Sequence, residues 1–452
     1  MKGQNNLFRG SSPSWANACV GNNGSPSFVE YAKGFSAAAN LLIQKTLEGR
    51  DLDYSVDEFI YPICFNMRHS VELRLKGTVS WLQLLSKHRQ RLPDFSLQSS
   101  HDLGRIWAFI KSHAPTLDKR YQYFVDKLDD FVSDLSEVDP TGQTFRYPHN
   151  QESEKHLTEV SVINVFILQK AFSEAEELLD KLNAFNEKLC LEYEQGTYTR
   201  KMSRHQIYLL AKELPPRSSW GDESFKFVKD RAKDHFGLSS NDFSRAARKI
   251  ESHFELAVLI DKNPLLEDLD FNQVDAFFDA WASVHDLSKL RAPTNEPQIH
   301  DLNFENVIKE LYEGDEKISK ALDSISSSVT AEAVGELRAL FYFARDLDYS
   351  EHYLEMASRE KRELGSLRDA EPGRYNELLC KLIYKTNAFQ NIVKSLLFLN
   401  QIALVNHLID RYELPKTLEW LDRAKSRKPC SHLTVLGYDS WADVDSWLTQ
   451  TA

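Results

Sequence analysis

The stretch Tyr61–Lys76, YPICFNMRHSVELRLK, has the periodicity of an amphipathic helix. Apolar residues recur three or four positions apart through it and its flanks, which places them on one helix face: Ile60, Cys64, Met67, Val71, Leu75 and Val79. Arg68, Glu72 and Lys76 follow one another at four-residue spacing, beside His69, so their side chains can form a ladder of alternating charge. We expect one face to pack and the other to present charge and an imidazole.

The helical period continues through most of the chain. Only 17 glycines and 15 prolines occur in 452 residues, and long segments lack alternating β-branched runs. This pattern predicts an all-α, multi-helix fold, with Pro62 either kinking its helix or marking the first turn. We expect helices over residues 31–49, 57–89, 102–113, 117–136 and 152–195, three helices within 203–262, and further ones over 272–290, 303–326, 330–346, 350–363, 374–411 and 415–425.

Composition suggests where the domains begin and end. Residues 1–30 are rich in Ser, Asn, Gly and Pro and are expected to form an irregular arm. A first helical domain should span residues 31–195, since the long helical pattern stops near Gly196. A second helical domain should span 196–452, with a sub-boundary near 292–302.

Charge and cysteine content exclude several classes of protein. A net charge of −12 opposes general binding to phosphate backbones, although Arg200, Lys201 and Arg204 form a local basic cluster. Five cysteines without a Cys-x-x-Cys pair predict neither a disulfide framework nor a zinc site. No run of eighteen apolar residues and no signal peptide occurs, so we expect a cytoplasmic protein that does not enter the membrane.

Motifs for common cofactor chemistry are missing from the sequence. It contains no phosphate-binding Gly-x-x-x-x-Gly-Lys loop, no Gly-x-Gly-x-x-Gly, no His-Glu-x-x-His and no Gly-x-Ser-x-Gly. We therefore expect no cofactor and no resident metal.

Three short motifs together resemble the HEPN superfamily of helical domains, over roughly residues 31–195. They are Glu72-Leu-Arg-Leu-Lys76, His101-Asp102-Leu103 and Phe145-Arg146-Tyr147-Pro148. The resemblance implies a helical bundle, often dimeric, from a bacterial toxin or phage-defence system. Some members are metal-independent ribonucleases, and others are nucleotide-associated or non-catalytic partners. Arg146 would be a phosphate or pocket residue, and the ligand-binding candidates are Arg68, His69, Glu72, Lys76, His101 and Arg146.

Catalysis in that superfamily uses an arginine and a histidine separated by four to six residues. The histidine would move the proton of the ribose 2′-hydroxyl or leaving group, and the arginine would stabilise the charge on phosphorus. Four such pairs occur: Arg200 with His205, Arg248 with His253, Arg345 with His352, and Arg427 with His432. The catalytic candidates are Arg345 and His352, because the polar Asp346 follows that arginine, and then Arg248 and His253.

Three His-Asp-Leu triplets, at His101, His285 and His300, permit a different chemistry. An HD-type phosphohydrolase would bind metal through a separate histidine such as His69 and a His-Asp dyad such as His101 with Asp102. A serine before a His-Asp pair is also an ordinary capping arrangement at a helix start, which Ser99 or Ser100 fits, with Asp102 favourable near the positive end of the helix.

These observations give three alternative functions. The first is a component of a bacterial anti-phage defence or toxin-type system that acts as a metal-independent ribonuclease on RNA or a nucleotide. The second is a non-catalytic helical interaction protein that forms a homo-oligomer or binds a protein partner or phage component. The third is an HD-type metal phosphohydrolase.

Overall fold

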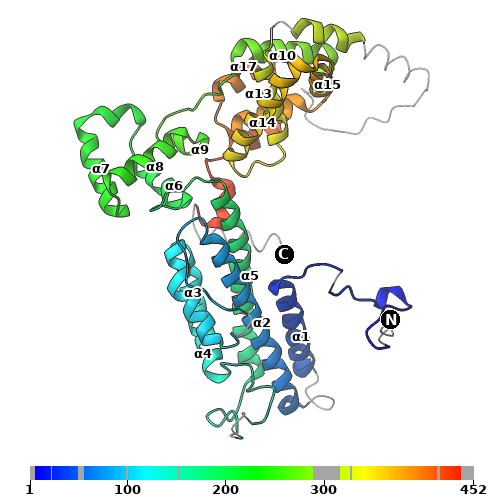
Figure 1. Cartoon of the computed structure of the whole chain (residues 1–452), viewed down its shortest axis with the longest axis vertical. Helices are drawn as coiled ribbons and strands as arrows, with labels where there is room; N and C mark the ends of the chain where they lie inside the picture. Colours follow the sequence, from blue (N-terminus) through cyan, green and yellow to red (C-terminus); the bar gives the residue numbers. More distant parts are fainter. Residues whose placement is uncertain are drawn as a thin grey trace. The chain divides into compact units, whose positions relative to one another are not determined.

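The computed structural model describes residues 6–21, 23–48, 55–97, 100–149, 153, 155–288, 316–325, 328–414 and 418–438 (Figure 1). Over these ranges the regular structure is helical, and the only β-type pairing is an isolated bridge between His149 and Lys155. The all-α prediction is confirmed. His300, the expected sub-boundary at 292–302 and most of the expected helix at 303–326 lie outside the described residues, although residues 316–325 are helical.

The chain divides into two compact units, Met1–Glu194 and Gln195–Ala452. The first unit contains the helices α1 (Phe28–Glu48), α2 (Val56–Leu85), α3 (Leu103–Leu117), α4 (Tyr121–Val138) and α5 (Val165–Glu194). A single 3-10 turn, η1 (Ser14–Ala16), precedes them. The long helix α2 contacts α1, α3 and α5, so it is the central helix of this bundle (Figure 1).

The apolar stripe of α2 forms the core of the first unit. Val71, Leu75 and Val79 are completely buried, and Cys64 and Met67 are nearly so. The expectation that the opposite face presents charge to solvent is wrong, because Arg68 and Glu72 are each 2% exposed. A helix contacted by three others has little surface left for solvent, so these charges are buried and must be paired within the protein.

The last helix of this unit begins later than expected. The sequence pattern placed its start near residue 152, whereas α5 begins at Val165. Asn164 explains the position, because its side-chain oxygen accepts hydrogen bonds from the N–H groups of Phe166 and Ile167. The preceding residues 158–163 read TEVSVI, and their β-branched side chains disfavour helix.

The second unit contains more helices than its sequence pattern suggested. Its described elements are α6 (Arg204–Glu213), η2 (Arg217–Gly221), α7 (Glu223–Phe236), α8 (Ser240–Ser252), α9 (Phe254–Val258), α10 (Phe271–Val284), α13 (Ala331–Phe343), α14 (Ser350–Ala370), α15 (Pro372–Ile383), α16 (Ala388–Phe398), α17 (Ile402–Arg411), α18 (Glu419–Lys425) and η3 (Ser431–Leu436). The single helix expected over 374–411 is wrong, since it is divided into α15, α16 and α17. Asn400 separates the last two with a φ of 55°, a left-handed conformation that asparagine tolerates.

Helix α13 lies at the centre of this unit and packs closely against α14. Val334, Leu337 and Leu340 are completely buried along it. Gly335 permits the close approach, because a Cβ atom at this position would lie 2.8 Å from the backbone of Lys361 on α14. Any larger residue would push the two helices apart.

Candidate functional site

The predicted ligand-binding residues Arg68, Glu72 and Lys76 of α2 form a buried ionic cluster, which the exposed His101 joins from the segment before α3. These four residues are here called the α2 cluster. The Arg68 guanidinium donates to three backbone carbonyls, with Nε 3.2 Å from Asp139 O and Nη2 2.6 Å from His101 O and 2.8 Å from Pro140 O. Its Nη1 donates to the Glu72 carboxylate. Arg68 therefore ties α2 to the chain segments before α3 and after α4.

Glu72 accepts the remaining bonds of the α2 cluster. Lys76 Nζ lies 2.8 Å from Glu72 Oε1, and His101 Nδ1 lies 3.0 Å from the same oxygen. Burial alone would raise the pKa of Glu72, but hydrogen bonds from His69 and Lys76 and the charge of Arg68 hold that pKa well below its usual range. Glu72 is therefore ionised at neutral pH, and the α2 cluster is satisfied by internal bonds.

The loop after α4 has a glycine that the α2 cluster requires. Gly142 has a φ of 76°, and a Cβ atom built there would lie 2.9 Å from Arg68 Nη1. Both the backbone conformation and the contact with the guanidinium favour glycine at this position.

The His-Asp motif at the start of α3 forms a helix cap. Asp102 is the N-cap residue, and its carboxylate accepts a hydrogen bond of 2.9 Å from the backbone N–H of Arg105. The His101 side chain is 62% exposed and contacts Glu72. Over the described ranges, no group of three or more His, Cys, Asp and Glu side chains is placed to hold a metal ion.

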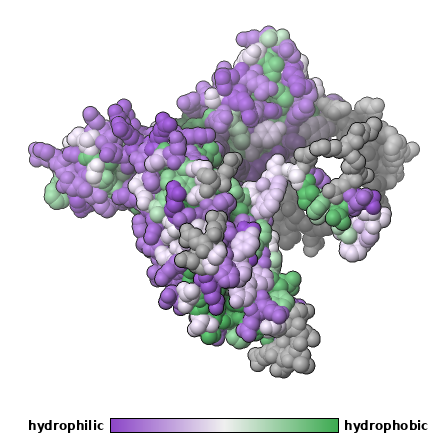
Figure 2. Space-filling model, turned by 60° about the horizontal axis from the view of Figure 1, so that its bottom comes forward, coloured by the Kyte–Doolittle hydropathy of each residue, from purple (hydrophilic) through white to green (hydrophobic). Residues whose placement is uncertain are grey.

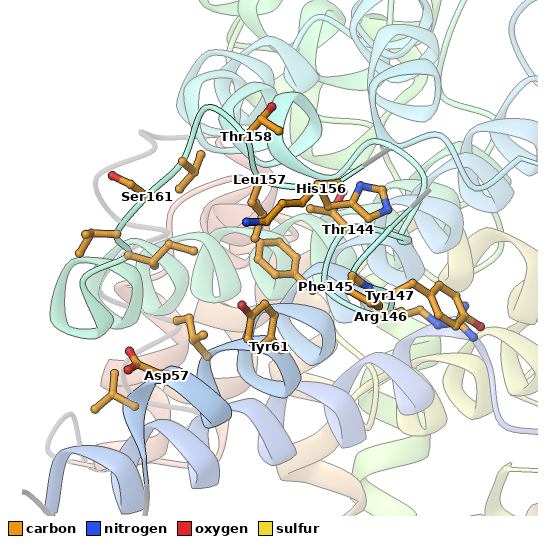
Figure 3. Close-up of a pocket in the computed structure, with 17 residues that line it drawn as sticks. Asp57, Tyr61, Thr144, Phe145, Arg146, Tyr147, His156, Leu157, Thr158 and Ser161 are labelled. Atoms are coloured by element: carbon orange, nitrogen blue, oxygen red, sulfur yellow. The ribbon is translucent and has the colours of Figure 1, made fainter. Parts of the chain in front are cut away.

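Arg146 lies at a pocket of about 970 Å³ at the end of the first unit (Figure 3). Its guanidinium carbon is 5.5 Å from the ring centre of Phe65 and 5.4 Å from that of Tyr147. The walls come from the first turns of α2 and from the loop between α4 and α5: Val56, Asp57, Ile60, Tyr61, Thr144–Pro148, Lys155–Thr158 and Val160–Ile163. We call this hollow the loop pocket.

Hydrophobic side chains surround the loop pocket and reach solvent. Tyr61 is 47% exposed and Val162 is 85% exposed, and the next turn of chain adds Phe166 and Ile167, both largely exposed. Figure 2, which brings this end of the first unit forward, shows hydrophobic residues exposed among hydrophilic ones. Exposed apolar surface beside a concave pocket is typical of a binding site.

The charges at the loop pocket are few and of both signs. Arg146 and Lys155 supply cations and Asp57 a carboxylate. The lining is thus mainly apolar and includes two cationic groups.

The favoured catalytic pair, Arg345 and His352, is not joined by a hydrogen bond among the described residues. The Arg345 guanidinium lies over the ring of Tyr342, with 5.1 Å between its central carbon and the ring centre. His352 Nδ1 instead lies 3.4 Å from the carboxylate of Asp346.

The second pair is also separated. Arg248 is exposed on α8, where its Nε donates to Ser244 O. His253 is buried and caps α9, with Nδ1 accepting hydrogen bonds from the backbone N–H groups of Glu255 and Leu256 at 3.1 and 3.2 Å. Because Nδ1 is an acceptor, the ring proton lies on Nε2, which is 3.0 Å from Glu351 Oε1.

A third pair, Arg427 with His432, is in direct contact. Arg427 Nη2 donates to His432 Nδ1 at 2.6 Å, and His432 Nε2 donates to the backbone carbonyl of Asp348. Burial is the main cause that lowers the pKa of His432 to about 4, so this imidazole is neutral at pH 7.

These two histidines belong to one buried group of the second unit, here called the C-terminal cluster: Arg204, His253, Glu255, Glu351, Arg427 and His432. Arg204 Nε lies 3.1 Å from Glu351 Oε1, and Arg427 Nη2 lies 2.7 Å from Glu255 Oε1. Burial would raise the pKa of Glu351, but Arg204 and His253 hold it well below the usual range. The buried charges therefore compensate one another.

Sequence reasoning named Arg204, His253, Arg427 and His432 but missed the two carboxylates that pair with them. Arg204 was expected in a local basic cluster with Arg200 and Lys201, yet it is 1% exposed. The partners Glu255 and Glu351 are about fifty and one hundred fifty positions away, and no local pattern joins them to Arg204. Lys155 and Val162 of the loop pocket were missed because they fell within the overlong predicted helix.

Within the described residues no helix combines the length and apolar character needed to cross a lipid bilayer. Comparison with protein-family models, curated proteins and solved structures gave no match to this chain.

Proposed function

We propose that this chain is a HEPN-like helical component of a bacterial anti-phage defence or toxin-type system, and that it binds a partner protein in the cytoplasm without catalysing a reaction. The motifs at Glu72–Lys76, His101–Leu103 and Phe145–Pro148 support the HEPN-like part of the proposal. The loop pocket with its exposed apolar rim is the observation that carries the binding role.

The hydrogen bonds of the paired histidines favour a role without catalysis. A general base needs a ring nitrogen that can reach the substrate proton. Both nitrogens of His253 and of His432 already contact protein groups, and both rings are largely buried. The contact between Arg427 and His432 is therefore better explained as part of the C-terminal cluster than as a ribonuclease centre.

The chemistry of the loop pocket favours a protein over RNA or a nucleotide. Val162, Phe166 and Ile167 expose aliphatic and aromatic surface. A phosphate backbone would not bury this surface, whereas the core of a protein interface would. Two cations beside Asp57 are few for a polyanion, and the net charge of −12 opposes one. A second copy of this chain, giving the expected homo-oligomer, is one such protein partner.

Cross-linking in bacterial cells during phage infection tests the binding role. A lysine-reactive reagent at Lys155, which lines the loop pocket, should join the wild-type chain to its partner, as read by mass spectrometry. Val162→Glu places a charge on the apolar rim and should abolish these cross-links. Phe227→Glu is the matched control, because Phe227 is 73% exposed on α7 of the other unit, and it should leave them unchanged.

Purified protein provides the opposing test. We expect no degradation of RNA with or without chelator. Metal-independent cleavage that is lost in His352→Ala or His253→Ala would contradict the proposal and support the ribonuclease. Cleavage abolished only by chelator would support the HD-type phosphohydrolase. In the cross-linking experiment, an equal set of cross-links from wild type and Val162→Glu would show that the loop pocket is not the binding site.

A further inference from the structure

Five residues of the segment 158–163 line the loop pocket: Thr158, Val160, Ser161, Val162 and Ile163. In the described part of the chain, no hydrogen bond uses a backbone N–H or C=O of these six residues, whereas His156 before them bonds to Pro148 and Asn164 after them caps α5. Val162 is 85% exposed, and Ser161 is also exposed. Thr158 and Glu159 are exposed as well, so four of the six residues of this segment lie at the surface.

The composition of this segment suits a strand. Thr158, Val160, Val162 and Ile163 are β-branched, which are the residue types enriched in β-sheets. Residues 160–164 contain no turn or bend, whereas Thr158 and Glu159 form a bend, and the neighbouring pair His149 and Lys155 already forms an antiparallel bridge. An unpaired run of this kind is a template for pairing with another chain.

We infer that the partner presents an extended peptide segment that pairs as a β-strand with the straight part of this segment, residues 160–163. This inference rests on the proposed function and specifies what the loop pocket recognises. Main-chain hydrogen bonds supply part of the affinity in such complexes, and pockets for alternate side chains supply specificity.

A two-stranded ladder alone is marginal in water, so side chains of the partner must add stability. Alternate residues of a strand point to the same face, which places every second partner side chain toward the apolar wall that includes Tyr61, Phe145 and Val160. Arg146 and Lys155 lie at the same pocket, so their positive charges favour an acidic residue in that segment. The ligand is therefore an extended peptide with alternating apolar residues and at least one Asp or Glu.

Selection of a displayed library of random twelve-residue peptides on the full-length chain provides the probe. We expect the selected peptides to alternate apolar and polar residues and to contain a carboxylate. Synthetic copies should bind the wild type and the Phe227→Glu control equally and should lose binding to Val162→Glu. Replacing the peptide carboxylate by an amide and replacing Arg146 by alanine should each weaken binding about tenfold, with little further loss when the two are combined.

A proline scan over residues 159–163 separates strand pairing from general disruption of the loop. In a ladder only every second residue directs its N–H group to the same neighbour, so prolines should weaken binding at alternate positions, by about three- to tenfold each. Circular dichroism and the melting temperature should stay constant across the scan. Uniform loss at all five positions, or no loss at any, would overturn strand pairing.

The same probe distinguishes failure of this inference from failure of the proposed function. Peptides with apolar residues three and four apart that compete with the cross-links at Lys155 would show a helix in the loop pocket, which contradicts strand pairing and retains the binding role. Peptides that bind Val162→Glu as well as wild type would contradict both.

Discussion

His253 Nε2 lies 3.0 Å from Glu351 Oε1, while Nδ1 of the same ring caps helix α9. This histidine connects the start of α9 to the start of α14, two segments almost one hundred residues apart. The link shows how a pattern that resembles a catalytic pair in sequence can serve the stability of the fold.

Removing Glu351 should destabilise the second unit strongly. Glu351→Ala leaves the guanidinium of Arg204, 1% exposed, without its nearest carboxylate. Breaking a buried ion pair in this way costs about 3–5 kcal/mol. Urea unfolding followed by tryptophan fluorescence measures the loss, with Glu355→Ala on the exposed side of the same helix as the control. A similar midpoint for the two variants would contradict the structural role of Glu351.

The free energy of unfolding should decrease as the pH is lowered, in a window set by His432. Its pKa in the folded protein is lowered to about 4 from an ordinary value of 6.5, so below pH 6.5 the unfolded chain binds a proton that the folded chain does not. The contribution of His432 to stability is therefore fully present above pH 6.5 and is lost as the pH falls toward 4. The total loss should be about 3 kcal/mol.

His432→Asn isolates that contribution, because the asparagine oxygen replaces Nδ1 as acceptor for Arg427 without a titrating ring. Urea midpoints measured from pH 7 to pH 4 should fall less steeply in this variant than in wild type. Equal slopes would show that other groups cause the pH dependence.

Gly142→Ala should destabilise the first unit by about 1–2 kcal/mol. Alanine is strained at a φ of 76°, and its Cβ would meet Arg68 Nη1 at 2.9 Å. Thermal unfolding measures the effect. Gly34→Ala on α1 is the control, because nothing lies within 4 Å of its added Cβ, and there alanine should stabilise by about 0.5–1 kcal/mol.

Arg68→Lys should show that geometry as well as charge holds the α2 cluster together. Lysine keeps the positive charge near Glu72 but cannot donate to the carbonyls of His101, Asp139 and Pro140 at once. Leaving buried acceptors unpaired should cost about 2–3 kcal/mol. Arg105→Lys on the exposed surface of α3 should be neutral in the same unfolding experiment, and equal stability of the two variants would count against this role.

The sequence permitted the helical class and the buried stripe of α2 to be predicted, because a period of 3.6 residues is a local property. Val71, Leu75 and Val79 are completely buried, as that period indicates. Exposure of Arg68 and Glu72 was predicted incorrectly. A charged helix face is usually exposed to solvent, and only the tertiary contacts of α2 bury this one. The loop pocket could not be predicted because the start of α5 depends on a single cap, Asn164.

Pairing of the buried charges in the second unit depends on contacts between residues very far apart in the chain. Arg204 and Glu255 are synthesised long before Arg427 and His432, which complete the C-terminal cluster. A nascent chain that has reached Glu255 therefore carries charges whose partners have not yet been made. Such non-local contacts slow folding, so this unit should acquire its final packing late in translation and depend more than the first unit on protection by chaperones until then.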